Sequence, residues 1–98
     1  MSDHPRYAEH VEFDEGNESE LARHNVTPLD VTRLLLNQPV WAPNKKGRGG
    51  LWLAVGRTEG RALCVPVRYD SLRRSLRPIT AWDASSGERQ RFLGREKP

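Results

Sequence analysis

The sequence predicts an α+β domain: a small antiparallel sheet, two N-terminal helices packed on one face of it, and a short C-terminal helix. Two observations carry this prediction. Leu51–Arg57 and Arg61–Tyr69 alternate apolar residues with others, which is the period of two that marks strands with one buried face. Thr27 before Pro28, and the capping-box spacing that begins at Ser85, are typical of helix starts. The predicted element order is β-α-α-β-β-β-α, to which the short run Val40–Ala42 can add one further strand before the last three.

The first elements are a short strand and a short helix. The strand is predicted over Glu9–Phe13. Asn17, with Glu20 three residues later, has the spacing of a capping box and predicts a helix over Glu18–His24. Asn25 suits a left-handed cap at the end of this helix. Because a helix of about two turns is marginal in isolation, it must pack on a neighbour.

The second helix has the clearest signals in the chain. Thr27 is its predicted N-cap, and the helix ends before Asn37, where a Pro follows two residues later. Its apolar stripe consists of Val31, Leu34 and Leu35. This stripe predicts that the helix packs across one face of the sheet.

The remaining elements are two strands and a helix. The strands are predicted over Val40–Ala42 and Arg74–Trp82, and the helix over Ser86–Leu93. Pro66 and Pro78 lie inside predicted strands. Because proline cannot donate a hydrogen bond to the ladder, each must take an edge-facing or bulged position.

Length and composition indicate one soluble domain. The 98 residues suffice for a single modest core, and we predict a flexible N-terminus over 1–8, one domain over 9–93 and a tail over 94–98. No apolar run approaches the roughly 18 residues of a membrane span, and no signal peptide is visible, so the default prediction is a cytoplasmic protein. Cys64 is interpreted as a packed apolar residue, with a reactive thiol as the minor alternative. His4 and His10 lack metal-ligand spacing, so no metal site is predicted.

The charge is unevenly distributed. Residues 1–40 carry a net charge of −5, and residues 41–98 carry +8. The arginines in and between the three central strands are Arg57, Arg61, Arg68, Arg73, Arg74 and Arg77. A basic half joined to an acidic half indicates one face for a polyanion, and an ordinary soluble surface with uneven charge is the alternative.

Short patterns also occur in a fixed order along the chain. They are Phe13-Asp14-Glu15, Leu21-Ala22-Arg23-His24-Asn25-Val26, Gly56-Arg57, Arg77-Pro78-Ile79-Thr80-Ala81 and Glu88-Arg89. This set, spread over roughly Val11 to Phe92, resembles the BrnT family of toxin–antitoxin toxins, which are small ribonucleases with a RelE-like fold. The resemblance implies an endoribonuclease that needs no metal or cofactor and cleaves RNA, mRNA in particular, to inhibit translation.

The resemblance also implies partners. A cognate ribbon-helix-helix antitoxin would silence the toxin, and operator DNA would be contacted only through the complex of the two proteins. A homodimer or a toxin–antitoxin heterotetramer is expected, with no membrane partner.

The catalytic residues that the resemblance implies are Asp14, His24, Arg57 and Arg77. Metal-free cleavage uses the 2′-hydroxyl of RNA as nucleophile, so the protein must orient the backbone, stabilise phosphoryl charge and move protons. Arginine suits the second task because its planar fork grips phosphate at two points and stays charged. Supporting residues expected to bind nucleic acid are Arg23, Lys45, Lys46, Arg48, Trp52, Arg68 and Arg89.

Each candidate also has a structural interpretation. A single arginine can be a solvated surface side chain, His24 can pack between helix and sheet, and Asp14 can cap or turn the chain. Glu88 is first the capping acid of the last helix and only second a catalytic group. Trp52 lies opposite the aliphatic positions of its strand, which makes it the best candidate for stacking on bases.

Three hypotheses about function follow. The first is the ribonuclease toxin. The second is a binding module of the same fold that holds antitoxin or nucleic acid without cleavage, favoured by departures from the family pattern at Phe13, Trp82 and Phe92, which lose an indole N–H, a charge and a hydroxyl. The third is an interaction domain without nucleic acid, which predicts Arg57 and Arg77 on opposite faces of the sheet.

Overall fold

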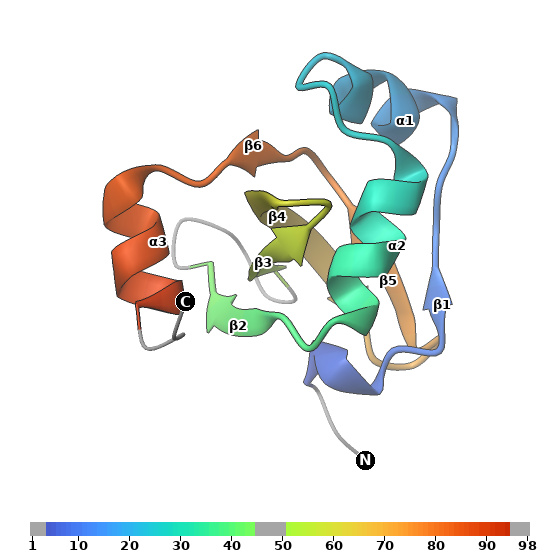
Figure 1. Cartoon of the computed structure of the whole chain (residues 1–98). Helices are drawn as coiled ribbons and strands as arrows, with labels where there is room; N and C mark the ends of the chain where they lie inside the picture. Colours follow the sequence, from blue (N-terminus) through green and yellow to red (C-terminus); the bar gives the residue numbers. More distant parts are fainter. Residues whose placement is uncertain (1–3, 45–50, 95–98) are drawn as a thin grey trace.

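The computed structural model describes residues 4–44 and 51–94, which form an α+β fold around a six-stranded mixed sheet (Figure 1). The predicted class is therefore confirmed. None of the helices in the described residues is long and apolar enough to cross a membrane. In chain order the elements are the 3-10 helix η1 (Pro5–Tyr7), β1 (His10–Val11), α1 (Glu15–Ala22), α2 (Pro28–Leu36), β2 (Val40–Pro43), β3 (Leu51–Thr58), β4 (Arg61–Asp70), β5 (Ser75–Pro78), β6 (Trp82–Asp83) and α3 (Ser86–Leu93).

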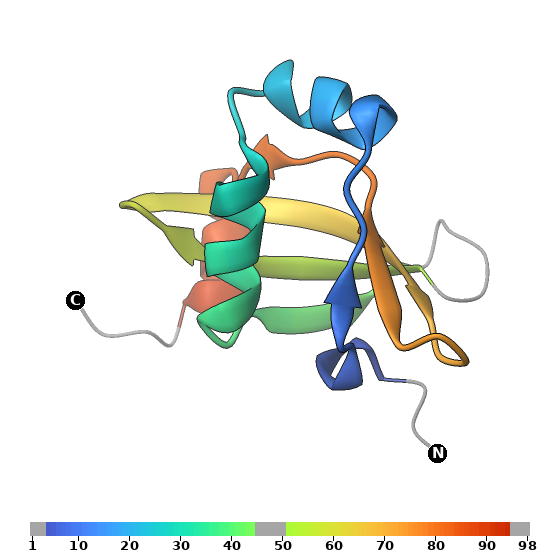
Figure 2. The same cartoon turned by 90° about the vertical axis from the view of Figure 1, so that its right-hand side faces the viewer.

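The hairpin of β3 and β4 is the centre of the sheet. Its pairing runs from Leu51 opposite Arg68 to Thr58 opposite Arg61. The strand order is β1-β5-β4-β3-β2, and β6 also pairs with β4. The prediction of an antiparallel sheet is wrong at one edge, because β1 runs parallel to β5. The N-terminal segment passes along this edge on its way to α1 (Figure 2).

The strand predicted over Arg74–Trp82, after the central hairpin, is two strands. β5 pairs with the end of β4 and β6 with its beginning, and the register shifts by one residue between them. Pro78 is the last residue of β5, and Pro66 lies where the partner of β4 changes. There the N–H of Ile79 donates to the carbonyl of Pro66 at 2.9 Å. Both prolines thus take the irregular positions that their missing N–H predicted.

Both faces of the hairpin are covered. Paired residues share a face and successive residues alternate between faces. Ala54 and Val65 belong to the core under α2, whereas Val55 and Cys64 belong to the core under α3. Figure 2 shows α2 in front of the sheet and α3 behind it. The prediction of one buried face is wrong because both sets of alternating residues are apolar at the centre of the hairpin.

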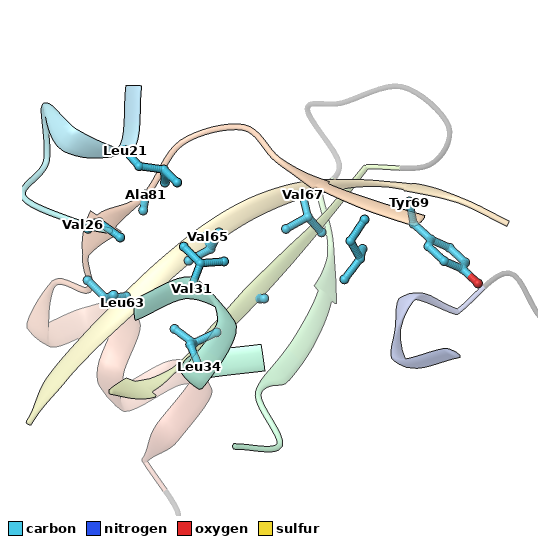
Figure 3. Close-up of a cluster of buried hydrophobic side chains, with 11 residues drawn as sticks. Leu21, Val26, Val31, Leu34, Leu63, Val65, Val67, Tyr69 and Ala81 are labelled. Atoms are coloured by element: carbon cyan, nitrogen blue, oxygen red, sulfur yellow. The ribbon is translucent and has the colours of Figure 1, made fainter. Parts of the chain in front are cut away.

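The larger core lies between α2 and the sheet (Figure 3). Val31 and Leu34 of α2 are fully buried against Leu63, Val65 and Val67 of β4. The predicted apolar stripe of this helix is therefore its packing face, and α1 adds Leu21 to the same core.

The helix α2 lies unusually close to β3 at Gly56. A Cβ atom at Gly56 would lie 3.2 Å from Cγ of Leu34 and 3.5 Å from Cβ of Pro39. Contacts of 3.2 Å are shorter than almost all real Cβ contacts. The missing side chain at Gly56 is therefore what allows Leu34 to reach the sheet.

Helix α1 begins three residues earlier than predicted. Its N-cap is Asp14, not Asn17: the Asp14 carboxylate accepts the N–H of Asn17 at 3.0 Å, and the Asn17 amide oxygen accepts the N–H of Asp14 at 2.8 Å. Gly16 lies in the first turn of the helix. The helix ends before His24, and Asn25 has the predicted left-handed conformation, with φ 59°.

Helices α2 and α3 agree with prediction. The Thr27 hydroxyl caps α2, with Asp30 completing the capping box. Ser85 and Glu88 do the same for α3.

Candidate nucleic-acid interface

Three of the predicted arginines lie on one face of the sheet. Arg68 is opposite Arg77, and Arg57 is opposite Ala62. Arg68 and Ala62 are both an even number of residues from Cys64 on β4, so all three arginines project from the face that α3 partly covers. The third hypothesis predicted opposite faces for Arg57 and Arg77, which the register contradicts.

Arg57 is nevertheless remote from the other two. Leu51 is level with Arg68 and Arg77 across the strands, and Arg57 lies six residues further along β3. At the rise of a strand, this separates Arg57 from the other two by roughly 20 Å. One phosphate cannot be gripped by Arg57 and Arg77 together.

His24 lies at the other end of α1 from Asp14. Ten residues of largely helical chain separate the two, which is roughly 15 Å along the axis. The His24 ring nitrogen Nε2 is 3.4 Å from Oε2 of Glu20, while Arg23 contacts the other oxygen of that carboxylate at 3.2 Å. The backbone carbonyl of His24 accepts a hydrogen bond from Arg61 at 3.3 Å. The proposed catalytic imidazole therefore lies at the opposite end of α1 from Asp14 and from the Arg77 guanidinium that Asp14 binds.

The structure does bring Asp14 and Arg77 together. Nη1 of Arg77 donates to Oδ2 of Asp14 at 2.6 Å, and Nη2 donates to Oδ1 at 3.1 Å. The pair lies over the first turn of α1, where a Cβ at Gly16 would be 3.3 Å from Oδ1 of Asp14 and 3.9 Å from Nη2 of Arg77. The glycine leaves room for the Asp14 carboxylate at the helix N-terminus, whereas the guanidinium would be in ordinary contact with such a Cβ.

This contact shifts the ionisation of Asp14. The hydrogen bond from Arg77, together with that from the N–H of Asn17, lowers the pKa of Asp14 from 3.8 to about 2. Because the folded-state pKa lies below the ordinary value, the ionised carboxylate stabilises the fold above about pH 4. That contribution is lost as the pH falls from about 4 through 2.

Asn17 fixes this site to the sheet. Its side chain is 4% exposed, and its amide nitrogen donates to the carbonyls of Glu12 at 2.9 Å and Pro78 at 3.0 Å. One side chain thus joins the end of β1, the end of β5 and the start of α1. The capping-box spacing was the only sequence signal at this position, and it predicted that Asn17 is the N-cap of the helix.

Trp52 faces away from the arginines. It is opposite Val67, on the face that α2 covers, and it packs against the larger core. The ring of His4 lies 4.8 Å from the Trp52 ring and 6.1 Å from that of Trp41. Trp52 and the arginine side chains therefore project from opposite faces of the sheet.

Glu88 is the capping acid of α3, as its primary interpretation predicted. Its carboxylate accepts the N–H of Ser85 at 2.9 Å and the indole N–H of Trp82 at 3.2 Å. The backbone hydrogen bond to Ser85 is the main reason that the pKa of Glu88 is lowered. The Trp82 side chain, which departs from the family pattern, thus holds Glu88 against the smaller core.

Cys64 is buried in that smaller core as a free cysteine, which confirms its interpretation as a packed residue. Burial, reinforced by the nearby Glu88 carboxylate, raises the pKa of the Cys64 thiol to about 12. We expect a disulfide reagent at pH 8 to label native protein at least about a thousandfold more slowly than protein unfolded in urea, because the thiolate is the nucleophile. Absorbance assays of thiol release measure both rates, and equal rates would contradict this burial.

The other candidates are dispersed or lie outside the described residues. Arg89 donates to the carbonyl of Ala84 at 3.1 Å, within its own helix cap. Lys45, Lys46 and Arg48 lie outside the described residues. The residues that flank this segment are placed: the N–H of Asn44 donates to the carbonyl of Leu51, which is opposite Arg68.

Sequence reasoning did not foresee how many arginines pair with carboxylates. In the described part of the chain, six ion pairs take up much of the positive charge. They are Arg23–Glu20, Arg33–Glu59, Arg61–Asp83, Arg73–Glu12, Arg74–Glu9 and Arg77–Asp14. Most of these arginines thus link segments of the fold, because the acidic N-terminal half packs against the basic half.

Arg68 differs from these six. It is exposed, and within residues 4–44 and 51–94 no carboxylate lies within ion-pairing distance of it. On the same face lie Arg77 and the half-buried Leu51 and Leu53. We call these four residues the arginine face. Among the described residues it combines an arginine without an ion pair, a second arginine directly opposite it on β5 and apolar surface.

A pocket of about 410 Å³ on the opposite face was also not foreseen. It lies between η1, β1, the end of α2 and Trp41. Its lining is mainly apolar, with Arg6, Glu9 and His10 contributing polar groups. Leu36, beside it, is 80% exposed. Its lining comes from segments that are distant in sequence, so no local pattern could have revealed it.

Comparison with known proteins adds no family to this description. No protein-family model matches the chain, and no curated protein matches it in sequence.

Proposed function

We propose that this protein is a binding module of the RelE-like, BrnT-type class that holds single-stranded RNA on its arginine face without cleaving it. The observation that carries the proposal is the cross-strand pair of Arg68 and Arg77, in which Arg68 forms no ion pair with any carboxylate of residues 4–44 and 51–94. Directly opposed residues have Cβ atoms about 5 Å apart. Two arginine side chains that start from such positions can both turn toward one phosphate or two successive phosphates.

The apolar part of the same face favours a single strand over a duplex. Leu51 and Leu53 are half-buried; Leu51 is level with the arginines, and Leu53 lies two residues further along β3 on the same face. Unstacked bases bring apolar surface to a protein, whereas a duplex presents mainly its phosphate backbone. The antitoxin partner that the resemblance implies stays a prediction.

Binding is proposed in preference to cleavage because of the distances between the candidate catalytic groups. His24 is remote from Asp14, and Arg57 is remote from Arg77. Asp14 itself is engaged by Arg77 through both carboxylate oxygens. A metal-free nuclease needs its proton-transfer and phosphate-binding groups to converge on one phosphate. The endoribonuclease activity implied by the resemblance therefore stays a prediction and becomes one outcome of the test.

The test measures retention and integrity of a labelled single-stranded RNA of mixed sequence. We expect fluorescence anisotropy to show binding that weakens steeply between about 50 and 200 mM salt, because counterions are released from the RNA. Gel analysis after the same incubation is expected to show intact RNA. Absence of binding at low salt would overturn the proposal, and cleavage would replace it with the ribonuclease hypothesis.

Arg68 is the residue whose loss should matter most. Replacing Arg68→Gln is expected to weaken RNA binding about threefold to tenfold and to reduce the salt slope by about 0.7, the value of one phosphate contact on a single strand. Arg33→Gln is the matched control, since it removes the same charge from α2 on the opposite face. Equal effects of the two variants would indicate a nonspecific charge effect.

A further inference from the structure

Asp14 forms an ion pair with Arg77, the residue directly opposite Arg68 on the neighbouring strand. We infer that Asp14 is a built-in competitor of phosphate for Arg77, which holds the RNA affinity of the arginine face below its maximum and is displaced from Arg77 when RNA binds. This inference rests on the proposed function and concerns the regulation of the same site.

The first argument is the form of the contact. Two nitrogens of Arg77 each donate to a different oxygen of Asp14, at 2.6 and 3.1 Å. This two-point grip is the one that guanidinium offers to phosphate. A phosphate can therefore bind Arg77 in this way only after Arg77 has released the Asp14 carboxylate.

The second argument is the charge around the pair. Arg68 and Arg77 are directly opposite on neighbouring strands, an arrangement in which like charges repel. Asp14 neutralises one of them in the free protein. A phosphate bound by both guanidinium groups would neutralise Arg77 in place of Asp14 and would also neutralise Arg68.

The third argument is that Arg77 can be released without unfolding α1. The side chains of Arg77 and Asp14 are 39% and 53% exposed, and ion pairs at such exposure are weak. The capping bond between Asp14 and the N–H of Asn17 does not involve Arg77. Asp14 can therefore keep its helix cap while Arg77 changes partner.

The test replaces Asp14→Asn. Asparagine is as good an N-cap as aspartate, so α1 keeps its start. We expect this variant to bind the labelled RNA about threefold to tenfold more tightly at low salt, with a salt slope steeper by about 0.7, because one more guanidinium becomes available to phosphate. Urea unfolding of each variant checks that the fold is retained.

Two further variants test whether the release of Arg77 is what raises the RNA affinity. Asp83→Asn makes the same change in net charge but releases Arg61, which lies on the α2 face and also donates to the carbonyl of Asn25 at 2.7 Å. Its RNA affinity is expected to change by less than about twofold. Adding Arg77→Gln to Asp14→Asn is expected to remove the whole gain.

The outcomes separate this inference from the proposed function. Wild-type binding with no gain in Asp14→Asn, or with an equal gain in Asp83→Asn, would overturn the inference and leave the proposed function standing. A gain that survives Arg77→Gln would also overturn it. Failure of the wild-type protein and of every variant to bind RNA at low salt would overturn the proposed function.

Discussion

Replacing Asn17→Ala is expected to lower the free energy of unfolding by about 2–4 kcal/mol, a large effect for one polar residue in a domain of this size. The substitution removes the hydrogen bonds to the carbonyls of Glu12 and Pro78 and leaves both without this partner. It also removes half of the capping box of α1. Urea unfolding followed by tryptophan fluorescence measures the loss.

Two variants test whether the bonds of Asn17 are responsible. Ser19→Ala changes an exposed residue of the same helix and is expected to alter stability by less than about 0.5 kcal/mol. Asn17→Asp keeps the size of the side chain but cannot donate from its ionised carboxylate, so it should be at least as destabilising as Asn17→Ala at neutral pH. A loss in Asn17→Ala no larger than that in Ser19→Ala would show that the two buried carbonyls do not depend on this residue.

The second large effect is expected where α2 meets β3. Gly56→Val is expected to cost about 2–3 kcal/mol, because its side chain would overlap Leu34 and Pro39. Leu34→Ala is expected to cost about 2–5 kcal/mol through the cavity it leaves. Since truncating Leu34 to alanine makes room for the valine side chain, the double variant should be less destabilised than the sum of the two by about 1 kcal/mol or more.

The control for this cycle is Gly87→Ala in α3. A Cβ there would meet only Oγ of Ser85, at 3.9 Å. Alanine also favours helix more than glycine does, so stability should be unchanged or raised by up to about 1 kcal/mol. Strict additivity of Gly56→Val and Leu34→Ala would mean that the helix can move away from β3 at no cost.

The sequence predicted those elements whose signals are local. The first residues of α2 and α3 follow from the N-caps Thr27 and Ser85, whose hydroxyl groups accept the N–H of a residue three positions later. The hairpin of β3 and β4 follows from the alternation of apolar residues. Asn25 and its left-handed conformation follow from the side chain alone. In each case the determining contacts lie within a few residues of sequence.

The predictions were wrong where contacts between residues far apart in the sequence determine the structure. The sequence around Asp14 and Asn17 allows either residue to cap α1, and the choice is made by the carbonyls of Glu12, just after β1, and Pro78 of β5, and by Arg77. The parallel pairing of β1 depends on a strand far along the chain. The second buried face of the hairpin depends on α3, which no periodicity in β3 reveals.

The candidate site was predicted only in part, for the same reason. The face shared by Arg68 and Arg77 depends on strand register, and the neutralisation of Arg77 depends on a carboxylate sixty-three residues away. Residue type and spacing could indicate that arginine was available for phosphate. They could not indicate which arginines already form ion pairs with carboxylates of the same chain.

The junction of β1 with β5 also affects how the protein folds. It consists of two residue pairs, and His10 meets Ser75 only after the chain has closed a loop of roughly 65 residues. The β3–β4 hairpin, with its many contacts between near neighbours in sequence, forms without that closure. The N-terminal segment is therefore expected to dock last and to detach first in local unfolding. Because β1 forms one wall of the pocket beside α2, each such opening would also remove that wall.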